Sequence, residues 1–334
     1  MEGKRALITG GSRGIGAETV RLFVEAGARV AFNYRAARER AEKLAAECGG
    51  PGRCIAIEQE LSSAEDGHAL VRKAVVALGR LDILVANHGI WEPGDAPIEQ
   101  MSEAQWRRTL AVNLDAVFGL VQEAVGEMLR QGEEAVRLQK KSSGKTELPK
   151  TVPQGLKPRA RSGALIGTTE AVPFQNSGSA GLETRTTAGQ ETGGTGVGGA
   201  IAGSIGWGRS LDGSPVKGHI VLISSTAGQR GEAYHSDYAV TKGALISLTK
   251  SLSTELAPKG IMVNCVAPGW VHTDMSAATL ADPVLGPKIG AGIPVGRAAT
   301  PREIAGPVLF LCTPLAGFIS GEILNVNGGA VLVG

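Results

Sequence analysis

The sequence lacks a paired-cysteine motif, an excess of charge of either sign and any long apolar run. Its four cysteines are widely spaced and form no C-x-x-C pair, which excludes the spacing typical of zinc sites and dithiol redox motifs. Free thiols of this kind are usual in a reducing compartment. Basic residues exceed acidic ones by 34 to 32, so the overall charge favours neither nucleic acid nor a membrane surface as a partner.

The absence of long apolar runs bears on location. The first such run, residues 6–8, is much shorter than the core of a signal peptide, and no run approaches the length of a membrane span. We therefore expect a cytoplasmic protein with no membrane partner. Hydrophobic residues make up 43% of the chain and charged residues 20%, and the length of 334 residues suits one large α/β unit with an insertion.

Short β-rich runs alternate with helical patterns along most of the chain. The expected strands are residues 6–10, 28–34, 53–58, 82–87, 219–225, 261–267 and 322–328. The expected helices are residues 17–26, 35–47, 63–78, 102–129 and 237–256. This alternation predicts βαβ units and a single Rossmann-like, doubly wound parallel sheet covered by helices on both faces.

One long segment, residues 133–216, breaks the alternation. Glycine, serine, threonine and proline dominate it, and it shows no sustained period of 2 or 3.6. Such a composition buries too little apolar surface to offset chain entropy, so we predict a loosely folded or disordered insertion before the fifth strand, between domain segments 1–132 and 217–334. Its first third is basic, which suits a solvated linker or an arm that binds RNA or acidic lipid.

Two glycine-rich runs compete as nucleotide-binding loops. Gly194, Gly196 and Gly199 match G-x-G-x-x-G, but no strand precedes them and no good helix follows. The run TGGSRGIG, residues 9–16, does not match that spacing, yet it follows the first expected strand and opens a helix. A helix N-terminus offers free N–H donors to a pyrophosphate, so we place the nucleotide at residues 9–16.

A second group of residues lies near the end of the fifth expected strand. Tyr238 and Lys242 are four apart on a helix and so share one face, and Ser225 ends the strand thirteen residues before Tyr238. Ligands of open α/β sheets bind at the carboxyl ends of the strands. The three side chains are therefore expected to converge on one crevice.

With these motifs in order, the sequence resembles the short-chain dehydrogenase/reductases, and within them the 3-oxoacyl-thioester reductases most. The resemblance covers residues 1–132 and 217–334. It rests on the T-G-x-x-x-G-x-G loop, the N-x-G after the fourth strand, a helix asparagine, a serine, Y-x-x-x-K and the P-G turn with its following threonine. These are Thr9, Gly10, Gly14 and Gly16; Asn87 and Gly89; Asn113; Ser225; Tyr238 and Lys242; Pro268, Gly269 and Thr273.

The resemblance implies roles for these residues. Asn113, Ser225, Tyr238 and Lys242 would be catalytic, and no metal is expected. The cofactor would contact Gly10, Ser12, Arg13, Gly14, Ile15, Gly16, Tyr34, Arg35, Glu60, Leu61, Asn87, Gly89, Tyr238, Lys242, Pro268, Gly269, Val271 and Thr273. Two residues depart from the family pattern. His88 replaces a small residue, and Glu60 stands where an aspartate usually contacts adenine.

The expected mechanism is hydride transfer to a ketone, with Tyr238 as general acid/base. Lys242 and a positive nicotinamide would lower the pKa of Tyr238, Ser225 would bind the substrate oxygen, and Asn113 would position a relay water. Since no acid ends the second strand and Arg13 and Arg35 lie nearby, we expect NADP(H) rather than NAD(H).

The substrate remains less determined. We expect a small-molecule ketone or acyl thioester bound under a lid, residues 273–297, in a homo-oligomer, either a dimer or a tetramer. Trp91, Trp270 and His235 are expected to border the pocket. An acyl carrier protein is a candidate partner, with Lys259 as a candidate docking residue, and nucleic acid is not expected. Two alternatives remain: a secondary-alcohol, sugar or steroid dehydrogenase, and a non-enzymatic nucleotide sensor or scaffold.

Overall fold

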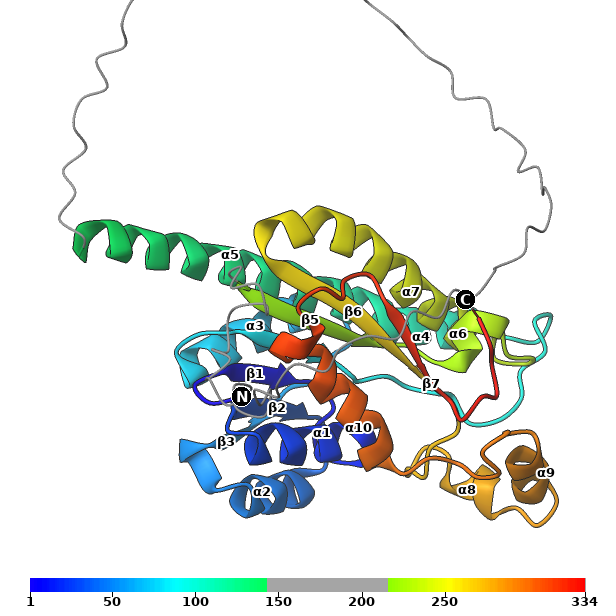
Figure 1. The fold of residues 1–334 in the computed structure, drawn as a ribbon. Coiled ribbons are helices and arrows are strands. Elements are labelled where there is room, and N and C mark those ends of the chain that lie inside the picture. The colour runs from blue at the N-terminus through cyan, green and yellow to red at the C-terminus, as the bar shows by residue number, and fades with distance from the viewer. Residues whose placement is uncertain (143–215, 334) are drawn as a thin grey trace, which may run out of the picture. The chain divides into compact units, whose positions relative to one another are not determined.

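A parallel sheet of seven strands forms the centre of the computed structural model, which describes residues 1–142 and 216–333. The strand order is β3-β2-β1-β4-β5-β6-β7, so the chain winds outward from β1 in both directions (Figure 1). The strands are β1 (Arg5–Ile8), β2 (Arg29–Tyr34), β3 (Cys54–Glu58), β4 (Ile83–Ala86), β5 (Gly218–Ile223), β6 (Ile261–Pro268) and β7 (Ile323–Val326). The predicted Rossmann-like fold and all seven predicted strands are confirmed.

Helices cover both faces of the sheet. They are α1 (Gly14–Glu25), α2 (Arg38–Glu47), α3 (Ala64–Leu78), α4 (Glu103–Leu110), α5 (Ala116–Ser142), α6 (Thr226–Arg230), α7 (Ser236–Leu256), α8 (Ala277–Ala281), α9 (Leu285–Ala291) and α10 (Pro301–Leu311). One apolar cluster joins the sheet to α1, α2 and α10, and a second joins it to α3, α5 and α7. The central strands β4 and β5 are buried on both sides, which explains their nearly continuous apolar sequence.

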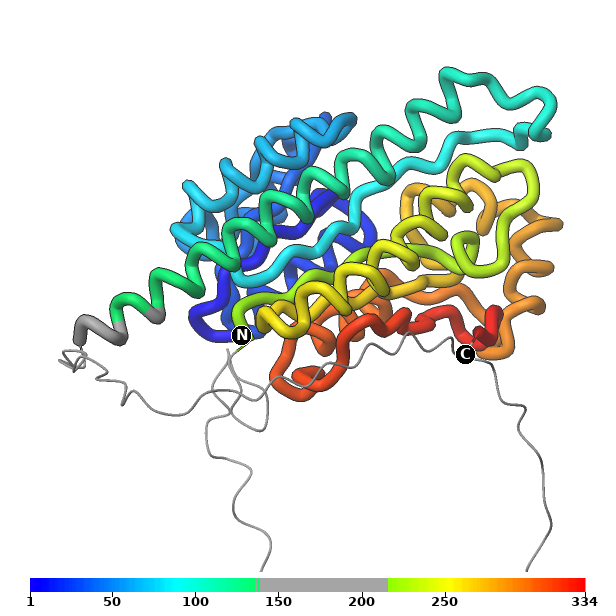
Figure 2. The backbone as a smooth tube through the Cα atoms, turned by 90° about the horizontal axis from the view of Figure 1, so that it is seen from above, coloured from blue at the N-terminus to red at the C-terminus, as the bar shows by residue number. Residues whose placement is uncertain are grey.

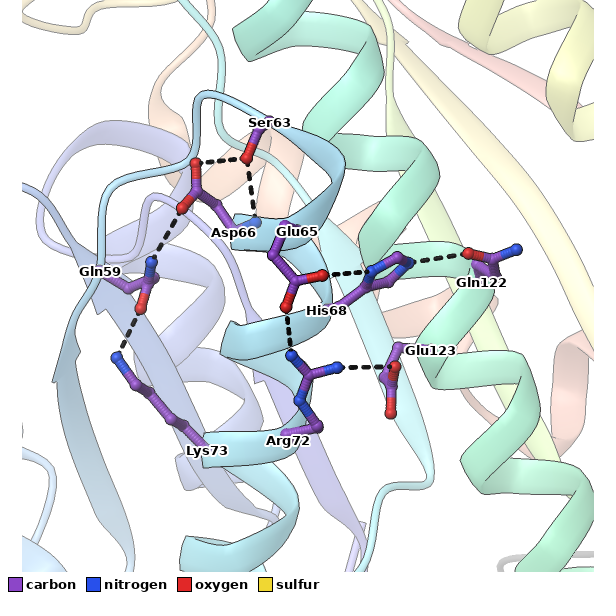
Figure 3. A network of polar contacts seen from close by, with 9 residues as sticks. All are labelled: Gln59, Ser63, Glu65, Asp66, His68, Arg72, Lys73, Gln122 and Glu123. Atoms are coloured by element: carbon purple, nitrogen blue, oxygen red, sulfur yellow. Dashed lines mark hydrogen bonds and ion pairs between the residues drawn. The ribbon is translucent and has the colours of Figure 1, made fainter.

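Two glycines let α3 and α5 run side by side at close range. A Cβ on Gly67 would lie 2.4 Å from the Ala116 carbonyl oxygen, and one on Gly119 would lie 2.0 Å from that of Ala64. A polar network closes the outer seam of this helix pair (Figure 3). In it, the Arg72 guanidinium bridges Glu65 and Glu123, and a His68 ring nitrogen contacts Gln122 at 2.8 Å.

Helix α5 differs from the prediction in its length. It continues to Ser142, into the segment that the sequence assigned to the insertion, because Glu, Ala, Arg, Leu, Gln and Lys, which dominate residues 133–142, have high helix propensity. Figure 2 shows α5 running across α3 and on beyond the sheet. The rest of the predicted insertion, residues 143–215, including the second glycine-rich run, lies outside the described residues.

Different elements lie at the two ends of the sheet. Short helices α6, α8 and α9 gather at the carboxyl ends of the strands, whereas the C-terminal end of α5 lies toward the amino ends (Figure 1). The chain re-enters the sheet at Lys217, whose N–H donates to the Gly260 carbonyl just before β6. The described chain therefore leaves α5 and returns to β5 at the end of the sheet opposite the predicted site.

Candidate active site

The first glycine-rich turn joins β1 to α1 in a conformation that requires glycine. Gly10 and Gly14 have φ values of +64° and +54°, in the left-handed region. A Cβ on Gly16 would lie 2.2 Å from the Gly10 carbonyl oxygen, so no larger residue fits there without moving the turn. The chain can therefore place its backbone close to a ligand at this point.

The N-terminus of α1 leaves donors available in this turn. Arg13 precedes the helix but its side chain caps no backbone N–H. The first hydrogen bond within the helix runs from the Ala17 N–H to the Arg13 carbonyl at 3.2 Å. The backbone N–H groups of the helical residues before Ala17 therefore have no carbonyl partner within the helix. Uncapped amides beside a glycine turn fit a pyrophosphate group, and the residues present thus fit a dinucleotide cofactor.

Thr9 connects this turn to the segment after β4. Its hydroxyl oxygen accepts hydrogen bonds from the backbone N–H groups of Asn87 and His88 at 2.9 and 3.1 Å. The Asn87 side-chain amide donates to the Thr9 carbonyl at 2.9 Å. The sequence motif did not reveal this role of Asn87, because the partners lie 78 positions apart. Asn87 thus fixes the glycine turn.

His88 is hydrogen-bonded at both ring nitrogens. Nε2 lies 2.9 Å from the Val112 carbonyl oxygen and so donates to it, which leaves Nδ1 to accept from the Thr9 hydroxyl at 2.9 Å. Burial, together with the nearby charge of Lys242, lowers the pKa of His88 to about 4. The ring is therefore neutral at pH 7 and bridges the glycine turn and the helix that carries Asn113.

Asn113 lies in one turn of π-helix, Ala111–Asp115, between α4 and α5. Its side-chain oxygen accepts from the Ile90 N–H at 2.7 Å, and its amide donates to the Ile90 carbonyl at 2.9 Å and toward the Thr241 hydroxyl at 3.3 Å. The amide is thus committed to holding the segment after Gly89. A water held at this position would use backbone carbonyls of the π-turn or the second lone pair of the Asn113 side-chain oxygen.

Ser225, Tyr238 and Lys242 come together at the carboxyl end of β5. Ser225 caps α6, and its hydroxyl oxygen accepts from the Ala227 N–H at 3.2 Å. The Lys242 ammonium is buried, donates to the Ile223 carbonyl at 2.9 Å and lies 5.6 Å from the centre of the Tyr238 ring. A Cβ on Gly89 would be 3.3 Å from this ammonium, so Gly89 keeps the space beside it open.

The electrostatics of the tyrosine differ from the expectation. Burial raises the pKa of Tyr238 to about 12, with the Ser225 hydroxyl opposing the rise and Glu232 adding to it. Burial also lowers the pKa of Lys242 to about 8. The predicted lowering of the Tyr238 pKa requires a positive nicotinamide as well as Lys242, and this chain's residues alone do not produce it, because desolvation is the largest influence on the phenol. The residues around Tyr238 therefore keep its phenol protonated.

An aromatic group borders the tyrosine. The Trp91 ring stacks on His235 with centroids 3.8 Å apart and meets the Tyr238 ring edge-on at 4.8 Å. Asp237, the residue before Tyr238, is buried and accepts from the Thr109 hydroxyl at 2.8 Å. Trp91 and His235 thus lie where the sequence analysis expected them, whereas nothing in the sequence indicated the contact between Asp237 and Thr109.

The segment after β6 closes the other side of the crevice. A Cβ on Gly269 would be 3.0 Å from Asn327, so the P-G turn packs tightly on the segment after β7. Val271 is buried and bridges to Ala299. A Cβ on Gly14 would lie 3.2 Å from the Thr273 side chain. The glycine turn and Thr273 therefore face each other at contact distance.

The adenosine end of the predicted site is rich in arginine. The Asn33 side chain accepts from the Gly10 N–H at 2.8 Å and donates to the Gln59 carbonyl at 2.8 Å, so it is fully used. Tyr34 turns its hydroxyl toward Glu58 at 3.3 Å. Arg35 pairs with Glu60 at 3.8 Å on the surface, and Leu61 is buried. Ser12 and Ile15, also predicted contacts, are half-buried in the turn.

The lid predicted from the sequence contains two short helices, α8 and α9. Leu280 and Ile289 line a cavity of about 330 Å³ between them, together with His272 and Arg297. Met275, Val284 and Leu285 are about half exposed. Within residues 1–142 and 216–333, no group of three side chains has the composition and spacing to hold a metal ion. No helix in those ranges is long and apolar enough to cross a membrane.

The fold and site together define a Rossmann-like oxidoreductase. Two family models match the chain, one described as short chain dehydrogenase over residues 4–136 and one as enoyl-(acyl carrier protein) reductase over residues 209–331. A 3-oxoacyl-[acyl-carrier-protein] reductase of Staphylococcus aureus is 30% identical over 327 residues, which cover 98% of this chain and 97% of that protein. The chain belongs to the short-chain dehydrogenase/reductase family, whose members act on CH–OH or keto groups.

Solved structures agree with this assignment. A glucose/ribitol dehydrogenase of Brucella melitensis matches with a TM-score of 0.68 and 27% identity, covering 100% of this chain and 98% of that one. A protein of Beutenbergia cavernae described as a putative NAD(P) dependent gluconate 5-dehydrogenase, solved with NADP bound at low occupancy, matches with a TM-score of 0.69 and 27% identity, covering 99% of this chain and 97% of that one. The family is thus shared by proteins named for ketoacyl reduction and for sugar oxidation.

Proposed function

We propose that the protein is an NADPH-dependent carbonyl reductase that transfers hydride to a ketone, specifically a 3-oxoacyl thioester. The observation that carries the proposal is the convergence of Ser225, Tyr238 and Lys242 at the carboxyl end of β5, opposite the glycine turn. The names of the 3-oxoacyl reductases among its relatives support the substrate class.

Tyr238 acts as the acid in this proposal. When bound, the reduced nicotinamide supplies the hydride, and the substrate oxygen must gain a proton. A phenol whose pKa is raised to about 12 is fully protonated at pH 7 and holds that proton ready beside Ser225. Because the Ser225 oxygen accepts from a backbone N–H, its own hydrogen, which is directed toward Tyr238, is available to donate to a substrate oxygen that binds beside the phenol and to stabilise the charge that develops there.

Lys242 and Asn113 support the proton transfer. The ammonium, with its pKa lowered to about 8, lies behind the tyrosine ring and favours the phenolate once the proton has left. Asn113 holds the Ile90 backbone and so fixes the wall beside Gly89. Its amide is occupied, so we propose that the relay water binds to backbone carbonyls of the π-turn.

The cofactor preference follows from charge. No carboxylate is available at the end of β2 for the ribose hydroxyl, since Asn33 is committed to the glycine turn and Arg35 follows. The side chains of Arg13 and Arg35 are exposed in the glycine turn and directly after β2. A 2′-phosphate suits such surroundings better than a free hydroxyl, which favours NADP(H) over NAD(H). The NADP bound to the Beutenbergia cavernae relative supports this preference.

The partners of the enzyme are part of the proposal. The apolar lid side chains suit an acyl chain, and an acyl carrier protein remains a candidate carrier. Lys259 does not support the docking of this carrier protein, because it precedes β6 at the amino end of the sheet and pairs with Glu255 at 3.2 Å.

Assembly and location are also part of the proposal. A homo-oligomer through α5 and α7 is supported by Phe118 and Val240, which are 51% and 47% exposed. Four free, buried cysteines fit a reducing, cytoplasmic location.

The test is a panel of ketones with NADPH and NADH. Acetoacetyl thioesters should consume the absorbance of the reduced nicotinamide, with NADPH preferred. Oxidation of sugars or secondary alcohols with NAD, and no ketone reduction, would favour the dehydrogenase alternative instead. No turnover with any substrate would leave the scaffold alternative, which rests on a segment outside the described residues.

A further inference from the structure

Two arginines hold one carboxylate at the mouth of the crevice. Arg40 Nη1 lies 2.6 Å from Asp274 Oδ2, and Arg13 Nη1 lies 3.6 Å from the same oxygen. The three residues come from different segments: the glycine turn, helix α2 and the start of the lid. The side chains of Arg13 and Arg40 are both 62% exposed and that of Asp274 is 50% exposed.

The position of this carboxylate relates it to the cofactor site. Asp274 directly follows Thr273, whose side chain faces Gly14 across the crevice. Arg13 ends the same glycine turn, and Arg40 lies on the helix that follows β2, where the ribose of a dinucleotide is recognised. An anion between these two guanidiniums therefore lies between the glycine turn and the helix that follows β2.

The two arginines can exchange the Asp274 carboxylate for another anion. The arginines lower the pKa of Asp274, so the carboxylate is charged at pH 7. Ion pairs this exposed are worth little, up to about 1 kcal/mol, so a competing anion can replace the carboxylate at small cost. A phosphate carries more charge and offers more acceptor oxygens than a carboxylate, and guanidinium groups bind it well.

We propose that Asp274 is an internal competitor for the cofactor's 2′-phosphate, and that Arg40 is a second specificity-determining residue that binds this phosphate once Asp274 is displaced. The inference rests on the proposed preference for NADPH and adds to it a residue outside the glycine turn and the end of β2. Displacement also releases Asp274, near the start of the lid, from α2, so binding of the phosphorylated cofactor is linked to the freedom of the lid that contains Asp274.

The same helix provides a matched control. Arg38 is also exposed and lies half a turn before Arg40, but it pairs with Glu58 and Glu42 rather than with Asp274. Replacing either arginine by glutamine removes one positive charge from α2. A difference between the two variants therefore reports the local site rather than the net charge of the helix.

The experiment measures the binding of 2′-phospho-ADP-ribose and ADP-ribose by calorimetry, with neither probe able to react. The wild-type chain should prefer the phosphorylated probe. Arg40→Gln should lower the affinity for that probe by about tenfold, which is the loss expected for one charge-assisted contact, and should leave the affinity for ADP-ribose unchanged. Asp274→Asn should strengthen the phosphorylated probe by up to about fivefold. Arg38→Gln should leave the ratio of the two affinities near its wild-type value.

The outcomes separate this inference from the proposed function. If the wild-type chain selects the 2′-phosphate but Arg40→Gln keeps that selectivity, or Arg38→Gln loses it equally, the role of Arg40 is wrong and the NADPH preference stands. If Asp274→Asn weakens both probes alike, Asp274 supports the crevice and does not compete. If the wild-type chain binds both probes equally, the NADPH preference fails, and the inference fails with it.

Discussion

At the scale of single residues, the surroundings of Tyr238 keep its phenol protonated. Burial and the neighbouring Glu232 raise its pKa, and only the Ser225 hydroxyl opposes them. A protonated phenol is what ketone reduction requires, whereas alcohol oxidation requires the phenolate. The residues of this chain by themselves therefore keep Tyr238 in the form that can donate a proton, and positive charge brought by the cofactor would favour the phenolate.

Removing the phenol tests this role directly. Tyr238→Phe should lower kcat by about a hundredfold or more, which is the usual contribution of a positioned acid, and should leave NADPH binding intact. Fluorescence titration with NADPH and steady-state rates measure the two effects. Tyr234→Phe, which removes a hydroxyl from an exposed tyrosine four residues earlier, is the control and should keep its turnover. Near wild-type rates for Tyr238→Phe would refute the assignment.

His88 shows what single residues could not reveal from the sequence. The departure from the family pattern was visible in the sequence. Its partners were not visible, since Thr9 and Val112 lie 79 and 24 positions away. Only the parallel arrangement of β1 and β4 brings Thr9 beside it. The structure therefore turns an odd residue into a bridge between two predicted site segments.

At the scale of elements, the glycine turn makes a sharp prediction. Gly16→Ala should weaken NADPH binding by about tenfold or more, because the new Cβ would lie 2.2 Å from the Gly10 carbonyl oxygen and would force the turn apart. Gly52→Ala is the control, since a Cβ there meets nothing within 4 Å. Equal affinities for the two variants and the wild-type chain would show that the turn does not hold the cofactor.

The elements that the sequence predicted and missed differ in a physical way. All seven strands were predicted because buried parallel strands read as short β-rich apolar runs between glycine-rich turns. Helix α10 was missed although Thr300 and Glu303 form a capping box, because Pro307 interrupts its pattern. Helices α8 and α9 are short and contain or adjoin glycine and proline, so their periodicity is too weak to recognise.

At the scale of the whole molecule, two buried histidines predict acid sensitivity. Burial lowers the pKa of both His88 and His219 from the ordinary value of 6.5 to about 4. Below pH 6.5 the unfolded chain therefore binds more protons than the folded one, and stability falls as the pH drops toward 4. Each histidine should cost up to about 2 kcal/mol at pH 5 relative to pH 7.

Urea unfolding of the wild-type chain and His88→Ala at pH 5 and pH 7 measures this effect. The variant should lose less stability between the two pH values than the wild-type chain does, even if it is less stable at pH 7. The neutral control is His272→Ala, which replaces an exposed histidine and should leave the pH difference unchanged. Equal losses in His88→Ala and the wild-type chain would contradict the lowered pKa of His88.

The connection between α5 and β5 gives the last prediction. Gly132 lies against the returning chain, since a Cβ there would be 2.7 Å from Lys217 Cδ. A short glycine-serine linker can therefore replace residues 133–215 and close the chain at the amino end of β5. The strand runs from Gly218 to Ile223, so about 20 Å separates this junction from Ser225.

For this shortened chain we expect kcat and the NADPH affinity to stay within about twofold of wild type, because loop length alters chain entropy only slowly. Steady-state kinetics and light scattering check activity and assembly together. Loss of turnover with an unchanged oligomeric state would show that the removed residues take part in catalysis, whereas loss of assembly alone would place their role at the α5 surface.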